Sequence, residues 1–215
     1  MDIPCFINCR DRLTDLRKLV DWLESTGIQR IILMDNDSSY EPLLAYYEET
    51  PHEVKRLGQN IGSRAIWDAN LAPNEHFVYT DPDVLPHEEC PLDAIDYLFE
   101  LSNRYPDLPK VALGLFIEDL PLLPSREWEE ELTRPERLME PGVLNSFVDT
   151  TFALHRPGQD FQFQSIRTTF PYMLRHSSWY ADLENLSEED RYYLDHAIGS
   201  VTASSWARTY QEMTR

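Results

Sequence analysis

The segment from Phe77 to Val84, with the sequence FVYTDPDV, places two carboxylates directly after a short apolar run. Side chains alternate along an extended backbone, so Asp81 and Asp83 can point the same way while Pro82 stiffens the turn between them. A buried strand that ends in paired carboxylates opens into a cleft. Such a pair can hold Mg²⁺ or Mn²⁺, which prefer oxygen ligands and also bind the phosphates of nucleotides. The segment therefore predicts a sheet with a metal and diphosphate site at its edge.

Strands and helices alternate through the residues that precede this segment. The apolar patterns predict strands at 3–8, 28–34, 52–57 and 77–80, with helices at 13–23, 42–49 and 63–70 between them. This alternation favours a mainly parallel sheet covered by helices, and ligands of such sheets bind beyond the carboxyl ends of the strands. We therefore expect an α/β fold built as a Rossmann-like three-layer sandwich.

The pattern is less regular in the second half of the chain. It predicts a helix at 92–105, a strand at 110–117 and a strand or hairpin at 143–154. The Pro- and Glu-rich stretch 119–141 is interpreted as a lid or an insertion. A helix at 188–198 follows Ser187, a residue type that favours helix N-caps. We expect one domain over residues 1–215.

Composition narrows the range of functions. The formal net charge is -19, and Lys18, Lys55 and Lys110 are the only lysines, so the chain lacks the basic surface that nucleic-acid binding needs. No segment approaches the ~20 apolar residues of a membrane span. The odd set of three cysteines has no zinc-ligand spacing, and we expect reduced packing residues. Together with the absence of a signal-like N-terminus, these features lead us to expect a cytoplasmic protein or an excised domain.

Four motifs follow the predicted strands in a fixed order. They are Asn8-Cys9-Arg10, Asp35-Asn36-Asp37-Ser38, Asn60-Ile61-Gly62-Ser63-Arg64 and Asp81-Pro82-Asp83. In this order they resemble the GT-A class of nucleotide-sugar-dependent glycosyltransferases, including small viral and bacterial domains of this size. The resemblance runs from about residue 3 to residue 179. It implies a nucleotide-binding half at 1–105 and an acceptor-side half at 106–215.

The resemblance also implies roles for individual residues. A nucleoside diphosphate sugar, with UDP as the favoured nucleotide, is the expected donor and a glycan hydroxyl the expected acceptor. Asn36-Asp37 replaces the consecutive aspartates of many relatives, which leaves the nucleobase open. The donor would be bound by Asn8, Arg10, Asp35, Asn36, Asn60, Arg64 and Asp81, and Mn²⁺ or Mg²⁺ by Asp81, Asp83 and His176.

A carboxylate after the metal motif would act as the general base of an inverting reaction. Asp149 is the favoured candidate, and Glu118 and Asp119 are its rivals. Asp149 lies between Phe147 and Phe152, an apolar setting that we expect to raise its pKa toward working pH.

Three other functions are compatible with parts of the sequence. A haloacid-dehalogenase-type phosphatase also carries Asp-x-Asp after an apolar strand, but on the first strand of its fold. A nucleotidyltransferase usually has a glycine-rich loop after the first strand, and residues 8–13 contain no glycine. A non-catalytic domain that binds nucleotide or glycan would have the same motifs without turnover.

Overall fold

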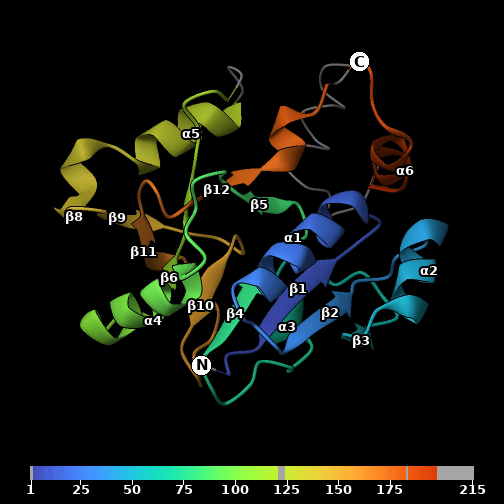
Figure 1. Cartoon of the computed structure of the whole chain (residues 1–215), viewed down its shortest axis with the longest axis horizontal. Coiled ribbons are helices and arrows are strands. Elements are labelled where there is room, and N and C mark those ends of the chain that lie inside the picture. The colour runs from blue at the N-terminus through green and yellow to red at the C-terminus, as the bar shows by residue number, and fades with distance from the viewer. Residues whose placement is uncertain (1, 121–123, 183, 198–215) are drawn as a thin grey trace.

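The computed structural model describes residues 2–120, 124–182 and 184–197. Its main sheet has nine strands in the order β3-β2-β1-β4-β10-β6-β11-β9-β8, with helices on both faces (Figure 1). Strands β3, β2, β1 and β4 are mutually parallel, and β10 and β9 run opposite to the remaining strands. The expected α/β class with a mainly parallel sheet is confirmed.

The main-sheet strands are β1 (Cys5–Cys9), β2 (Ile31–Asp35), β3 (Glu53–Arg56), β4 (Phe77–Thr80), β6 (Lys110–Ala112), β8 (Leu138–Glu140), β9 (Val143–Phe147), β10 (Ala153–His155) and β11 (Gln164–Thr168). A second sheet of three strands has the order β5 (Val84–Pro86), β12 (Met173–His176) and β7 (Gly114–Leu115). The helices are α1 (Thr14–Ser25), α2 (Glu41–Glu49), α3 (Ala65–Asp68), α4 (Ala94–Arg104), α5 (Pro124–Leu132) and α6 (Glu188–Ala197), with 3₁₀ turns η1 (Pro135–Arg137) and η2 (Ser177–Tyr180).

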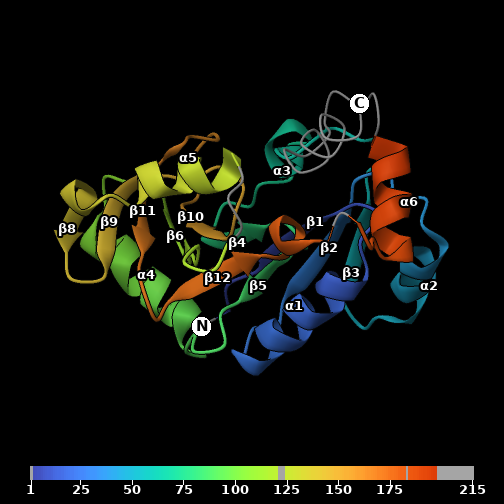
Figure 2. The same cartoon turned by 90° about the horizontal axis from the view of Figure 1, so that it is seen from above.

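The alternation of side chains along the strands produces the layers. In β1, Cys5 and Ile7 belong to the large core that also contains Leu16 and Leu23 of α1, whereas Phe6 packs in a smaller core on the opposite face. Figure 2 shows α1 and α4 on one side of the sheet and α3 and α5 on the other. The expected three-layer arrangement is therefore present, and both faces of the central strands are buried.

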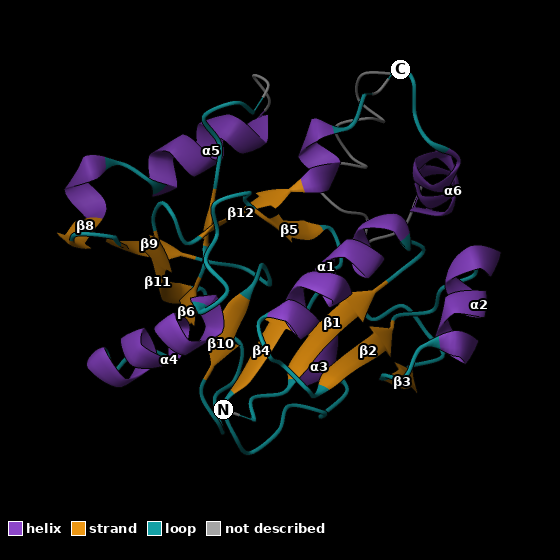
Figure 3. Cartoon of the chain, viewed as in Figure 1, coloured by secondary structure: helices purple, strands orange, loops and turns teal. Residues whose placement is uncertain are grey.

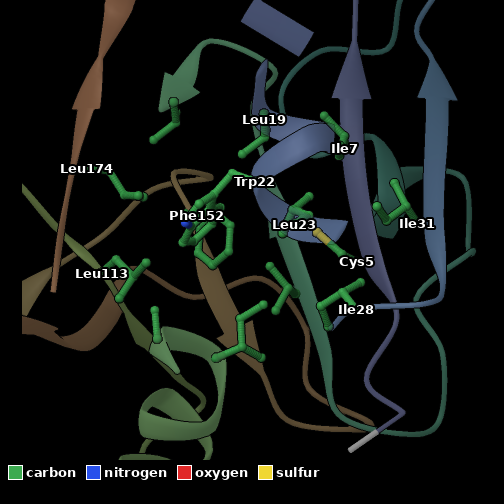
Figure 4. Close-up of a cluster of buried hydrophobic side chains, with 14 of the residues drawn as sticks. Cys5, Ile7, Leu19, Trp22, Leu23, Ile28, Ile31, Leu113, Phe152 and Leu174 are labelled. Atoms are coloured by element: carbon green, nitrogen blue, oxygen red, sulfur yellow. The ribbon is translucent and has the colours of Figure 1, made fainter. Parts of the chain in front are cut away.

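One core joins the two halves of the chain. Trp22 of α1 meets Phe152 edge to face, with 5.7 Å between the ring centroids. Leu113 and Leu174 lie beside this pair (Figure 4). Phe152 and Trp22 are both buried, so the segment that precedes β10 is anchored against α1.

The second sheet was not predicted. Residues 110–117 form two short strands in different sheets, β6 and β7, instead of one strand. Gly114 permits the change of sheet, because a Cβ atom there would lie 2.2 Å from the carbonyl oxygen of Thr168. Figure 3 shows β5 and β12 apart from the main sheet. Strands β5, β11 and β12 had no counterpart in the sequence-based prediction.

Other predictions for the second half have mixed outcomes. Residues 143–154 contain two strands, β9 and β10, but β6 and β11 lie between them, so no hairpin forms. The stretch 119–141 contains α5, η1 and β8, which is an edge strand. Ser187 caps α6, since its hydroxyl accepts a hydrogen bond from the Asp190 amide at 3.0 Å. Ile198, where that helix was expected to end, lies outside the described residues.

Among the described residues no helix is long and apolar enough to cross a membrane. Cys5, Cys9 and Cys90 are free thiols, the first two buried and the third half-buried, as expected of reduced packing residues.

Candidate functional site

A cleft of about 290 Å³ opens at the carboxyl ends of β1, β2 and β4. Most of the residues singled out from the sequence meet in it, although they come from segments up to 168 positions apart, the separation of Asn8 and His176 (176 − 8). This is the edge of a parallel sheet at which ligands are expected. The lining residues are Asn8, Arg10, Arg12, Asn36, Asn60, Gly62, Ser63, Asp81, Pro82, Asp83, Asp149, Thr150, His176 and Tyr193.

Asp83 and His176 are brought together by the second sheet. Val84, the first residue of β5, pairs with His176, the last residue of β12, and the amide of Ser177 donates to the Asp83 carbonyl at 2.8 Å. As a result His176 Nδ1 lies 3.6 Å from Asp83 Oδ2. The same Nδ1 atom lies 3.0 Å from the Ser178 hydroxyl, and the ring is stacked on Trp179 with 4.6 Å between the centroids.

The two aspartates of the motif are in different electrostatic states. Burial and repulsion from Asp83 and Asp149 raise the pKa of Asp81 well above its usual value. Burial also acts to raise the pKa of Asp83, but His176 and Arg12 outweigh it and the net pKa is lowered. Arg12 Nε lies 4.0 Å from Asp83 Oδ2. If Asp81 and Asp83 were both ionised, His176 and Arg12 would therefore stabilise the charge of Asp83, while that of Asp81 would remain unfavourable.

Asp81, Asp83 and His176 offer oxygen and nitrogen atoms of the kinds that bind divalent cations. Within the described ranges, no three His, Cys, Asp or Glu side chains form a group that could by itself hold a metal ion. A complete protein cage is not required for Mg²⁺, which usually keeps several waters and takes one or two carboxylates plus substrate phosphates. Asp81, Asp83 and the imidazole of His176 line one cleft and offer a partial set of this kind.

A second part of the cleft lining is built from amide groups that are linked by hydrogen bonds. The Asn36 carboxamide accepts from the Ile61 amide at 2.8 Å and donates to the Gly62 carbonyl at 2.9 Å. Asn8 donates to the same carbonyl at 3.3 Å, and the Gly62 amide donates to Asn60 Oδ1 at 3.0 Å. Gly62 has a φ of +88°, which favours glycine. We call Asn8, Asn36, Asn60, Gly62 and Ser63 the amide wall.

Asn8 leaves one acceptor without a partner among the described residues. Its Oδ1 atom is buried and receives no hydrogen bond, although the residue lines the cleft. A buried unpaired acceptor is costly, typically about 1–3 kcal/mol, unless a ligand or water donates to it. The atom is suited to a nucleobase N–H or a ribose hydroxyl.

Asp149 lines the same cleft and is exposed to solvent. Its Oδ1 atom accepts hydrogen bonds from the Thr151 amide, at 3.0 Å, and from the Thr151 hydroxyl. Surrounding protein atoms act to raise its pKa, but the Thr151 hydrogen bonds, Arg167 and His176 outweigh them. The pKa of Asp149 is therefore lowered, and the expectation of a raised value was wrong, because local hydrogen bonds prevail over the apolar neighbours.

The rival carboxylates lie elsewhere. Asp119 is exposed and bound by Arg175, with Nη1 to oxygen distances of 2.6 and 2.7 Å. Glu118 lines a separate apolar pocket together with Phe116 and Met173. Neither residue contributes to the lining of the cleft.

Two of the predicted donor-site residues are also absent from the lining of the cleft. Asp35 is buried and accepts hydrogen bonds from the Ser38 amide at 3.0 Å and the Tyr47 hydroxyl at 3.3 Å, so it stabilises the turn after β2. Arg64 is exposed and lies 3.9 Å from Asp68 of the same helical turn. Arg10, by contrast, lines the cleft with a half-buried side chain.

Sequence reasoning missed the contribution of α6. Tyr193 lines the cleft, and the guanidinium of Arg12 lies 4.4 Å from the centroid of its ring. Arg12 also pairs with Asp190 at 3.2 Å, and Glu189 accepts from the Leu13 amide at 2.9 Å. No local pattern in the sequence shows that this helix returns to the start of α1. Its acidic first turn was the available signal.

No family model and no curated protein sequence matches the chain. Among solved structures, glucosyl-3-phosphoglycerate synthase from Mycobacterium tuberculosis, in complex with Mn²⁺, UDP-glucose and phosphoglyceric acid, aligns with a TM-score of 0.48 and 15% identity, covering 72% of this chain and 56% of that chain. HddC from Yersinia pseudotuberculosis aligns with a TM-score of 0.40 and 19% identity, covering 53% of this chain and 58% of that chain. This chain thus matches just over half the length of either structure.

Proposed function

We propose that the chain is a metal-dependent glycosyltransferase of the GT-A type, which moves a sugar from a nucleoside diphosphate sugar to a glycan hydroxyl. The observation that carries the proposal is the convergence of an amide wall, a partly neutralised carboxylate pair and a separate exposed carboxylate in one cleft. Each group suits one part of such a reaction. Both halves of the chain contribute to the cleft, so we also propose that they act as one domain.

The donor diphosphate would lie between the carboxylate pair and the arginines. Asp81, Asp83 and His176 would hold Mn²⁺ or Mg²⁺, which when bound neutralises charge on the departing nucleoside diphosphate. Arg10 and Arg12 line the same cleft and can bind phosphate oxygens with their guanidinium forks. A cation bound here would offset the repulsion from Asp83 and Asp149 that helps raise the pKa of Asp81, and would thereby favour the ionised carboxylate.

The amide wall would bind the nucleoside. Its loop is already held by Asn36, so the peptide groups of residues 60–62 are fixed before a ligand arrives. Asn8 Oδ1 would accept from a ribose hydroxyl or from a base N–H such as that of uracil, and UDP is the favoured donor nucleotide. We do not assign Asp35 and Arg64 to the donor site, since the protein's own groups engage both side chains away from the cleft.

Asp149 would be the general base. Its lowered pKa keeps the carboxylate ionised at neutral pH, and its exposure allows an acceptor hydroxyl to approach. The carboxylate would take the proton of that hydroxyl as the oxygen attacks the anomeric carbon on the side opposite the diphosphate. A single base acting in one displacement inverts the anomeric configuration, so we propose an inverting mechanism.

Calorimetric binding of nucleoside diphosphates and their sugars in the UDP, GDP, CDP and dTDP series, each with Mn²⁺ and with EDTA, tests the proposal. We expect binding of one series with Mn²⁺ and its loss with EDTA and in Asp83→Asn. Product released with that donor would then be examined by NMR for its anomeric configuration. Absence of binding across the whole panel would overturn the proposed function, and binding without turnover on any glycan acceptor would leave a non-catalytic domain.

A further inference from the structure

The main-chain carbonyl groups of residues 147–149 accept hydrogen bonds from two buried cations, Arg167 and Lys110. Arg167 Nε donates to the Phe147 carbonyl at 2.8 Å. Lys110 Nζ donates to the carbonyls of Val148 and Asp149 at 2.7 and 2.5 Å. Both cations are buried, with exposures of 1% for Lys110 and 4% for Arg167. We call this arrangement the carbonyl cradle.

The surroundings of Lys110 hold its ammonium group in place. The Nζ atom lies 4.7 Å from the centroid of the Phe161 ring, a cation–π contact. Arg167 is fixed in turn by a buried ion pair with Glu129 of α5. The backbone of Asp149 is thus tied both to the start of β6 and, through β11, to α5.

A lysine is energetically unfavourable at this buried position. Burying an ammonium group is unfavourable unless its hydrogen bonds and charge are compensated, and apolar residues of similar size would often give an equally stable core. The net pKa of Lys110 is lowered to about 7, because burial and, to a smaller extent, Arg167 lower it more than Asp149 raises it. A buried titratable group of this kind, bonded to the main chain of a cleft residue, indicates a role beyond packing.

We propose that Lys110 is a positioning residue for Asp149: its ammonium group fixes the carbonyl cradle from which the Asp149 carboxylate projects into the cleft. The inference rests on the proposed function only for the role of Asp149 as base. Thr151 orients the carboxylate itself, and Lys110 fixes the backbone that carries it. A shift of about 1 Å in a catalytic group can cost about 10²-fold in rate, so a loosened cradle is expected to lower kcat.

The cradle makes positioning dependent on pH. The charged or titratable groups that face Lys110 are Asp149, Arg167 and His155. His155 of β10 pairs with Lys110 in the sheet, and burial and the charge of Lys110 lower the pKa of His155. As pH rises through about 7 the ammonium loses its charge. A neutral amine keeps two donors but loses the stronger charge-assisted bonds. Turnover should therefore fall above neutral pH while donor binding does not.

The free energy of unfolding should rise with pH over the range in which turnover falls. The folded pKa of Lys110 lies below its unfolded value of 10.5, so between about pH 7 and 10.5 the unfolded chain binds a proton that the folded chain does not. In that window this group increases stability as pH rises, and below it the contribution is constant. Wild type should thus gain stability relative to Lys110→Met from pH 7 to 8.5 while its turnover declines.

Lysine-selective ¹³Cε labelling of the whole chain gives a direct first test. The chain has three lysines, and the side chains of Lys18 and Lys55 are 57% and 35% exposed. We expect one signal, which disappears in Lys110→Arg, to titrate near pH 7. The absence of any signal that titrates near pH 7 would overturn the proposal without reference to any activity.

Kinetics of variants give the second test. Lys110→Met should lower kcat about 10²-fold, leave the affinity for donor and Mn²⁺ unchanged, and lose the alkaline decline of turnover. Lys110→Arg, which keeps a cation at this position, should recover part of kcat and show no alkaline decline. Lys55→Met, the same substitution at an edge strand, is the matched control and should behave like wild type.

The outcomes separate this proposal from the proposed function. Failure of wild type to bind any donor overturns the proposed function, and the lysine titration still decides whether the cradle exists. Donor binding with unchanged kcat and pH profile in Lys110→Met overturns the positioning role alone. If Lys110→Met does not fold, the wild-type pH profile and Lys110→Arg decide, and a flat wild-type profile from pH 6.5 to 8.5 counts against the proposal.

Discussion

The two walls of the cleft differ in how their polar atoms are satisfied. On the amide wall, Asn36 of the turn after β2 hydrogen-bonds to Ile61 and Gly62 of the loop before α3, and the Gly62 amide donates to Asn60 of the same loop. On the other wall, which we call the ionic wall (Asp81, Asp83, Asp149 and His176), carboxylates crowd together and Asp81 carries a strongly raised pKa. Apart from Asn8 Oδ1, the amide wall is held by hydrogen bonds between its own groups, whereas the carboxylates of the ionic wall repel one another.

This difference suggests that the two walls have different roles. A wall that is already hydrogen-bonded loses little freedom on binding, so it favours recognition of a rigid ligand part such as a nucleoside. A wall with unbalanced negative charge gains most when a cation enters. Substitutions on the ionic wall should therefore change metal binding and turnover, whereas substitutions on the amide wall should change stability and nucleotide binding.

The largest effect is expected at Asp149. Asp149→Asn preserves the acceptor for Thr151 but removes the base, so kcat should fall about 10³-fold, within the range that general bases contribute. Donor affinity measured by calorimetry with Mn²⁺ should stay unchanged, since the variant leaves the carboxylate pair intact. A kcat within tenfold of wild type would contradict the assignment of the base.

Asp119→Asn is the matched control for that substitution. Asp119 was the rival base, but it is bound to Arg175 outside the cleft lining. Its variant should keep kcat within a fewfold of wild type. If Asp119→Asn lost more activity than Asp149→Asn, the base would have to be sought on the segment that follows β7.

The next effect is expected at His176. His176→Ala should weaken the affinity for Mn²⁺ about 10- to 100-fold, the range found when groups that support a metal site are removed. Titration of Mn²⁺ in the presence of nucleotide measures this. His196→Ala on α6 removes an exposed imidazole outside the cleft lining and should leave the affinity unchanged. An unchanged Mn²⁺ affinity in His176→Ala would remove the residue from the ionic wall.

The amide wall was more accessible to prediction than the ionic wall. Strands β1, β2 and β4 and helices α1 and α2 form from segments next to one another in the sequence, and their order follows from short crossovers. Asn8 is the penultimate residue of β1 and Asp81 directly follows β4, so their meeting at one sheet edge could be inferred. Asp35 shows the limit, because its carboxylate turns back to cap its own loop.

The ionic wall depends on pairings that no local pattern reveals. His176 reaches Asp83 through the pairing of β5 with β12, two short strands separated by 173 − 86 = 87 positions that lack a clear alternation. Strand β10 inserts between β4 and β6 and carries the segment that contains Asp149 to the aspartates. The lowered pKa of Asp149 arises from hydrogen bonds whose geometry the sequence does not show. The residue types could be chosen from the sequence, but not the electrostatics.

The smallest effect is expected on the amide wall itself, at Asn36. Asn36→Ala removes two hydrogen bonds, but the Gly62 carbonyl still receives one from Asn8, so the free energy of unfolding should fall by about 1 kcal/mol. Chemical denaturation measures this, with Asn74→Ala, an exposed loop residue, as a control within about 0.5 kcal/mol of wild type. Because the loop at 60–62 loses its hydrogen bonds to Asn36, nucleotide affinity should weaken while Mn²⁺ binding without nucleotide stays the same. If Asn36→Ala weakened Mn²⁺ binding as much as His176→Ala, the two walls would act as one unit and the division between recognition and catalysis would be wrong.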